Sequence, residues 1–176
     1  MDVSKFEGIV SRLSGASVVA GWPDGNLTAA EAYAHLLDKR ATGKDQPALG
    51  RPVSLALIAR TLNYGREPGT TLGGVKYGAI PARPFMDLAR KNFESEFPRL
   101  LKAYLPKVLS GTMSVDSFLS MVGARMEGKI REAMTDGNWT PLAPSTLARR
   151  RHGGSAPLVD TGTLRASVSH EVKKRG

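Results

Sequence analysis

The longest periodic run of apolar residues lies between Tyr77 and Leu109. Its apolar positions recur at steps of three and four, which places them on one face of an amphipathic helix. They are Phe85, Leu88, Ala89, Phe93, Phe97, Leu100, Leu101, Tyr104, Leu105 and Val108. Because a proline inside a helix removes a backbone donor and clashes with the preceding turn, the pattern predicts a kink or a restart at Pro98.

A proline-rich segment leads into this central helix. Each proline fixes its own φ and restricts the residue before it to extended conformations. Residues 80–83 are therefore predicted to be a stiff extended arm, with the next proline at the first helical position. We expect a structural junction here that seats the helix against the sheet, formed by Ile80, Pro81, Arg83, Pro84 and Phe85.

Shorter patterned segments flank the junction and the central helix on both sides. Helical spacing is present over residues 3–13, 29–38, 55–64 and 115–136. Ser54 and Ser114 are expected to cap the last two of these helices, and Gly65 to end the helix over residues 55–64. Residues 16–22 and 168–172 have the apolar, β-prone character of strands. The glycine-rich residues 69–78 are predicted to form either a hairpin or a flexible loop.

Two glycines, Gly123 and Gly128, fall inside the predicted helix over residues 115–136. Glycine in a helix interior costs about 1 kcal/mol relative to alanine. We therefore expect another stretch of backbone to approach the helix closely at these positions.

Together these elements predict an α+β fold. In it, a small antiparallel sheet packs against the long, proline-kinked central helix, with additional helices and extended arms. The length of 176 residues predicts one domain spanning 1–176. Residues 27–52 are expected to be an insertion or a mobile loop, and residues 139–176 a C-terminal arm with short helices and a final strand.

The charge balance is strongly basic, with a formal net charge of +9. Such a chain favours anionic partners, although a solvated basic surface explains the same number. The absence of cysteine excludes disulfides, thiolate zinc sites and cysteine nucleophiles. The chain contains no run of eighteen consecutive apolar residues, so we expect no membrane span. We see no secretory signal, so we expect the protein to stay in the compartment where it is made.

One triplet, Asp160-Thr161-Gly162, matches the active-site sequence of aspartic proteases. In those enzymes two such aspartates share one proton. Too few residues follow Gly162 to complete the β-barrel that a protease needs. The alternative, which we favour, is that Asp160 caps a short helix.

Metal, cofactor and phosphate sites have little support in the sequence. His35, His152 and His170 are scattered and match no metal-ligand spacing. The glycines between residues 65 and 78 lack the lysine and hydroxyl residues of a phosphate loop. We therefore expect no catalytic residues, no metal and no cofactor.

The basic residues gather in short clusters, of which Arg149-Arg150-Arg151 is one. No aromatic residues are interleaved with them, as a stacking platform for single strands would require. We expect Arg149, Arg150 and Arg151 to face DNA or a protein partner, and this rests on charge clustering alone.

Three stretches, taken together, resemble a known family. They are residues 58–65 followed by 80–86, the helix pair over 111–134 interrupted by a glycine, and residues 139–150 followed by 157–168. Their order is similar to that of the tail-completion and virion-morphogenesis proteins of tailed bacteriophages, including the minor tail protein Z type. Residues 27–52 depart from the family pattern, being longer and more helical than the short turn expected there.

The resemblance implies a structural, non-enzymatic role at the head–tail junction of a virion assembled in the bacterial cytoplasm. It implies a neck, tail-completion or tail-terminator protein that forms a homo-oligomeric ring, often of six copies, around the DNA channel. The implied partners are further copies, neighbouring connector and tail-tube proteins, and genomic DNA through nonspecific contact, without a membrane. A basic, sequence-nonspecific nucleic-acid-binding accessory protein is the alternative, and an aspartic protease that uses Asp160 is a remote one.

Overall fold

The computed structural model describes residues 3–23, 54–70, 74, 76–150, 154–160 and 162–174, without the side chains of Val3, Lys5, Phe6 and Arg149. The chain divides into two compact units, each built from segments that are distant in sequence. Unit 1 lies within residues 1–23, 85–137 and 168–176, and unit 2 within residues 24–84 and 138–167. The expected insertion over residues 27–52 lies outside the described residues.

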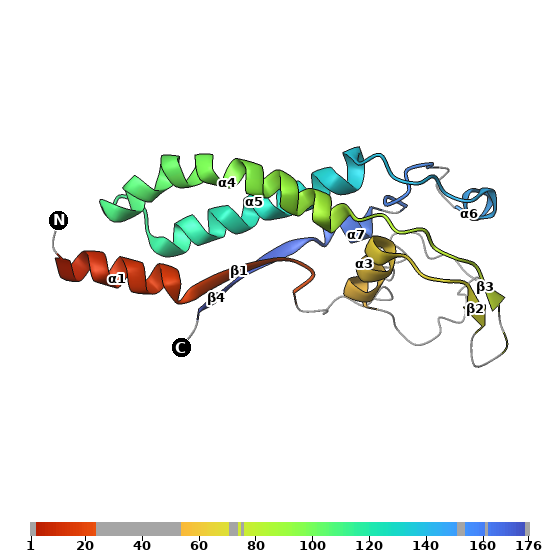
Figure 1. Cartoon of the computed structure of the whole chain (residues 1–176), viewed down its shortest axis with the longest axis horizontal. Helices are drawn as coiled ribbons and strands as arrows, with labels where there is room; N and C mark the ends of the chain where they lie inside the picture. Colours follow the sequence, from red (N-terminus) through yellow and green to blue (C-terminus); the bar gives the residue numbers. More distant parts are fainter. Residues whose placement is uncertain are drawn as a thin grey trace, which may run out of the picture. The chain divides into compact units, whose positions relative to one another are not determined.

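Two long helices form the centre of unit 1. Helix α4 spans Phe85–Leu109 and α5 spans Val115–Asp136, and they pack side by side (Figure 1). Ser114 caps α5 by accepting a hydrogen bond from the backbone N of Ser117 at 3.0 Å, as its sequence predicts. The apolar face predicted for α4 is confirmed, since Phe85, Ala89, Leu100 and Val108 are buried.

Both prolines lie inside α4, which continues through them without a restart. The restart considered for Pro98 is therefore not found. Pro98 and Pro106 are exposed, so water can hydrate the carbonyl groups that lose an N–H partner. The helix begins at Phe85, one residue after the predicted position of Pro84.

A two-stranded antiparallel sheet packs on the helices of unit 1. Strand β1 (Ala16–Gly21) pairs with β4 (Ser169–Lys174) in a register that places Val18 opposite Val172. Both strands pack against α5. The predicted α+β fold, with a small antiparallel sheet on a long helix, is confirmed, and α5 is the helix that contacts both strands.

Helix α1 (Val3–Ser14) completes the core of unit 1. The buried residues of this core come from α4 and α5, and partly buried side chains from α1, β1 and β4 surround them. The buried members are Val108, Val115, Phe118, Leu119 and Val122. Among the described helices, none is long and apolar enough to cross a membrane.

Unit 2 is built from short elements. Helix α3 (Leu55–Tyr64) begins at the predicted cap, where Ser54 Oγ accepts from the backbone N of Leu57, and ends at Gly65. Strands β2 (Gly69–Thr70) and β3 (Lys76–Tyr77) pair antiparallel, so the glycine-rich segment forms a hairpin. Two short helices, α6 (Pro144–Arg149) and α7 (Thr163–Ala166), come from the predicted C-terminal arm. The final strand of that arm, β4, belongs to unit 1.

A polar cluster attaches β4 to α5. His170 Nδ1 contacts Glu127 Oε1, and Glu127 Oε2 pairs with Arg131 Nη2 at 2.7 Å. Arg131 also donates to the backbone O of Val168 at 2.6 Å. The His170 ring occupies the space that a Cβ at Gly123 would need.

The prediction that another backbone approaches these helical glycines is wrong. The group against Gly123 is the His170 side chain, and no atom of the described residues lies within 4 Å of a Cβ placed at Gly128. Gly123 is therefore required by packing, whereas the described structure gives Gly128 no such role.

These two glycines provide a matched pair of substitutions. Gly128→Ala should raise the free energy of unfolding by up to about 1 kcal/mol, because alanine is the better helix former. Gly123→Ala should lower it by about 1–3 kcal/mol, because the His170 ring must move away from Glu127. Urea denaturation of both variants measures the difference. Equal stabilisation by the two substitutions would contradict the close packing of His170 on α5.

A second polar contact ties α1 and β4 to the first turn of α5. Asp116 forms two salt bridges. Its Oδ2 lies 2.9 Å from Arg12 Nη2, and its Oδ1 lies 3.1 Å from Lys174 Nζ. The hydrogen bond from Lys174, followed by the charges of Lys174 and Arg12, lowers the pKa of Asp116 below its usual value. The carboxylate therefore stabilises the fold when it is charged.

The lowered pKa of Asp116 predicts a contribution to stability that acid removes. It is present above the unfolded carboxyl pKa of about 3.9 and is lost as the pH falls through the lower folded value. Asp116→Asn should therefore be less stable than the wild type at pH 7, and the difference should vanish in acid below the folded pKa. Chemical denaturation of both proteins across this pH range measures it, and a pH-independent difference would show that the charge is not responsible.

Candidate functional site

The predicted junction lies beside the C-terminal end of α3 in unit 2. Ile80 and Arg66 exchange two backbone hydrogen bonds, each of 2.8 Å. The backbone N of Arg83 then donates to the O of Leu62 at 3.0 Å. The residues between α3 and the hairpin are thus joined to the segment that leads into α4.

Gly65 allows this close approach. Its φ is +77°, in the region that favours glycine, and a Cβ there would lie 2.7 Å from the O of Ile80 and 2.8 Å from the N of Ala82. Any other residue would be strained and would also push the two segments apart. The glycine that the sequence identifies as a helix stop is therefore also a contact point of the junction.

Arg83 is the buried centre of the junction, at 2% exposure. Its Nε donates to the O of Thr140 at 3.0 Å, and its Nη2 to the O of Pro141 at 3.4 Å. Its Nη1 is 3.5 Å from the O of Pro81, a weaker contact. One guanidinium thus joins the two proline-rich arms of unit 2. Burial, and then the positive charge of Arg150, lower the pKa of Arg83 from its usual value.

Arg150 closes the neighbouring loop of unit 2. Its Nη1 donates to the O of Gly154 at 2.7 Å and to the O of Val159 at 3.1 Å, and its Nε lies 3.8 Å from Asp160 Oδ1. Only 7% of its side chain is exposed. This guanidinium is used inside unit 2 and does not face outward, in contrast to what charge clustering predicts. The side chain of Arg149 and all of Arg151 lie outside the described residues.

The predicted cap at Asp160 is wrong. The N-cap residue of α7 is Gly162, which has a left-handed backbone and makes no side-chain cap hydrogen bond. Asp160 instead faces Arg150. A protease aspartate needs a second carboxylate that shares its proton, whereas the charged partner of Asp160 among the described residues is a guanidinium.

Phe85 begins α4 as a fully buried residue of unit 1. Its ring meets Trp22, just beyond β1, edge to face at 6.2 Å between centroids. Within three residues, the chain thus passes from the buried Arg83 of unit 2 to the buried Phe85 of unit 1, across the exposed Pro84.

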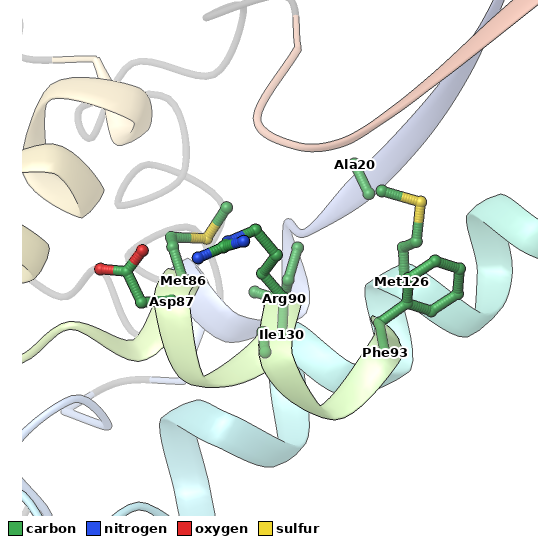
Figure 2. Close-up of a pocket in the computed structure, with 8 residues that line it drawn as sticks. Ala20, Met86, Asp87, Arg90, Phe93, Met126 and Ile130 are labelled. Carbon is green, nitrogen blue, oxygen red and sulfur yellow. The ribbon is translucent and has the colours of Figure 1, made fainter. Parts of the chain in front are cut away.

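Unit 1 also contains a cavity of about 260 Å³ beside β1, α4 and α5. Figure 2 shows Met86, Arg90, Phe93 and Met126 around it. The lining is mostly apolar, with Asp87 and Arg90 as its charged groups, and Arg90 donates to Glu94 at 3.0 Å. The cavity suits an apolar group and offers little acid–base chemistry.

The described part of the chain contains no group of three or more His, Asp and Glu side chains that could hold a metal ion. Of the predicted site residues, the structure brings Ile80, Pro81 and Arg83 into one bonded arrangement. It adds Arg150 as a second internal guanidinium. The sequence offered no signal for the carbonyl acceptors of either arginine, because main-chain acceptors do not depend on residue type.

Comparisons with protein-family models, with curated proteins and with solved structures find no match to this chain.

The role of Arg83 predicts a large effect of its removal. Arg83→Ala should lower the free energy of unfolding by about 2–4 kcal/mol, because it removes a buried side chain together with the hydrogen bonds that join the two arms. Arg60→Ala, at an exposed arginine of α3 in the same unit, should change it by less than about 0.5 kcal/mol. Denaturant unfolding monitored by circular dichroism measures both. A destabilisation at Arg83 no larger than at Arg60 would refute the bridging role.

Proposed function

We propose that this chain is a structural protein of the head–tail junction of a tailed bacteriophage. In this proposal it is a neck, tail-completion or tail-terminator protein that assembles into a homo-oligomeric ring around the DNA channel and joins the tail to the head. Its partners are further copies of itself and the adjoining connector and tail-tube proteins. It acts through repeated geometry and not through catalysis.

The observation that carries the proposal concerns the stretches that resemble the phage family. Residues 58–65, 80–84, 139–150 and 157–167 of these stretches belong to unit 2, whereas residues 111–134 belong to unit 1. Arg83 and Gly65 join the first three, and Arg150 joins the third to the fourth. Stretches whose order alone suggested the family are therefore also partners in one arrangement, which is what a shared structural role requires.

The physical character of unit 2 is compatible with a ring subunit. A ring of heterologous contacts closes only when every copy presents its surfaces at the same angle. Such constancy requires segments outside helices and strands to be held firmly. Arg83 and Arg150 provide this by donating to main-chain acceptors of the proline-rich arm and the loop.

Exposed apolar side chains of unit 2 offer contact area for a neighbouring copy. Leu57 and Tyr64 lie seven residues apart on α3, and therefore on one face, with 51% and 73% of their surfaces exposed. Large exposed apolar groups are common at protein interfaces. They support assembly as the mode of action.

The proposal predicts a defined assembly in solution. After nuclease treatment and in about 0.5 M salt, which screens contacts through residual DNA, the purified protein should form one species. Its mass should be a fixed multiple of the 18.8 kDa chain and should persist on dilution. Light scattering coupled to size-exclusion chromatography measures this mass. The second readout is whether the protein is present in fractions of purified virions. A strict monomer that is absent from virions would refute the proposal.

The second candidate is a basic accessory protein that binds nucleic acid without sequence preference. It is favoured by exposed cations on α4 that lack ion-pair partners among the described residues. This candidate predicts salt-dependent binding to duplex DNA by a chain that forms no ring, so the same mass measurement separates the two.

A further inference from the structure

The outer side of α4 carries a line of cations, Lys91, Arg99 and Lys102, which we call the α4 basic ridge. All three residues are exposed. At about 100° per residue they fall within about 80° of one another around the helix. This arc is opposite the buried side, which packs on α5 (Figure 1). The ridge therefore belongs to the solvent-facing surface of unit 1.

The cations of the ridge differ from most other basic side chains of unit 1 because they have no ion-pair partner among the described residues. Elsewhere in the unit, carboxylates within 4 Å neutralise the positive charges. These paired cations are Arg12, Arg90, Arg125, Lys129, Arg131, Lys173 and Lys174. The ridge is thus a part of unit 1 where exposed positive charges have no carboxylate partner among the described residues.

The C-terminal half of the ridge has no acidic residue near it in the sequence, whereas Asp87 and Glu94 flank Lys91. Between Glu96 and Asp116 the chain has three basic residues and no acidic one. Lys91 and Lys102 are eleven residues apart, or about 16 Å along the helix axis. That length corresponds to about five base-pair steps of duplex DNA, each of about 3.4 Å. The ridge therefore extends along a length of duplex that offers several phosphates to its three cations.

We propose that the α4 basic ridge binds the phosphate backbone of duplex DNA without reading its sequence. The inference rests on the proposed function for its setting, since it assigns the surface of the ring subunit that faces the DNA. The ridge differs from the DNA contact expected at Arg149, Arg150 and Arg151, and of these Arg150 donates to carbonyl acceptors within unit 2.

The composition of the ridge favours duplex DNA over other anionic partners. Its intervening exposed positions are Asn92, Glu94, Ser95 and Pro98, so it has no exposed aromatic side chain on which single-stranded bases could stack. It also lacks the aromatic and apolar anchors that dominate protein interfaces. A membrane-bound basic helix would insert its apolar face, but here that face is buried against α5.

The test compares two triple variants of the full-length protein, each lacking three positive charges. The ridge variant is Lys91→Gln/Arg99→Gln/Lys102→Gln. The control is Arg90→Gln/Arg125→Gln/Lys173→Gln, at exposed cations that already have carboxylate partners. Fluorescence anisotropy with a labelled duplex of random sequence, at a series of salt concentrations, gives the affinity and its salt dependence. Circular dichroism verifies that each variant is folded.

We expect the wild type to bind with an affinity that falls steeply as salt rises. The slope of log affinity against log salt should decrease by about 0.9 for each phosphate that the protein no longer neutralises, and thus by up to about 2.7 in the ridge variant. The control should retain most of the wild-type slope. An equal decrease in the two variants, or no binding by the wild type, would overturn the inference. A ring that forms normally in the ridge variant would show that failure to bind DNA is separate from failure to assemble.

Discussion

The arrangement of unit 2 depends on the hydrogen bonds that the Arg83 guanidinium donates to main-chain carbonyl groups. The arm on either side of Pro141 lies outside helices and strands, so no regular ladder of backbone hydrogen bonds holds it in place. Arg83 supplies two hydrogen-bond donors from a buried position and joins residues more than fifty positions apart in sequence. Burying a charge is costly, and the carbonyl dipoles around the guanidinium offset part of that cost.

Unit 1 is held together differently. Its core consists of apolar side chains from two long helices, and its polar contacts lie at the margin, where Glu127 and Asp116 attach the C-terminal strand to α5. Glu96 adds a contact between α4 and the paired cations Arg125 and Lys129 of α5. Within the described part of unit 1, Lys91, Arg99 and Lys102 of the α4 basic ridge are left without a carboxylate partner. An apolar unit and a unit fixed by buried arginines are compatible with the positioning role that we propose.

Much of this structure follows from local sequence signals. The caps at Ser54 and Ser114, the apolar faces of α4 and α5, and both strands of the main sheet are predicted because they depend on spacing and on short-range hydrogen bonds. Features that depend on distant partners are not predicted. The sequence around Gly123 does not indicate that His170 packs there, and a row of arginines does not reveal that Arg150 turns inward. Asp160 illustrates the same limit, since its role is set by the position of Arg150 and not by its own neighbours.

Amide hydrogen exchange in the Arg83→Lys variant tests the central role of this residue most directly. Lysine keeps the charge but cannot donate to two arms at once in the planar geometry of a guanidinium. We predict that the amides of Arg66 and Ile80, which bond to each other's carbonyl groups, will exchange about tenfold faster or more than in the wild type. The amides that pair β1 with β4 should be unchanged. Unaltered exchange at Arg66 and Ile80, or an equal increase throughout both units, would contradict the account.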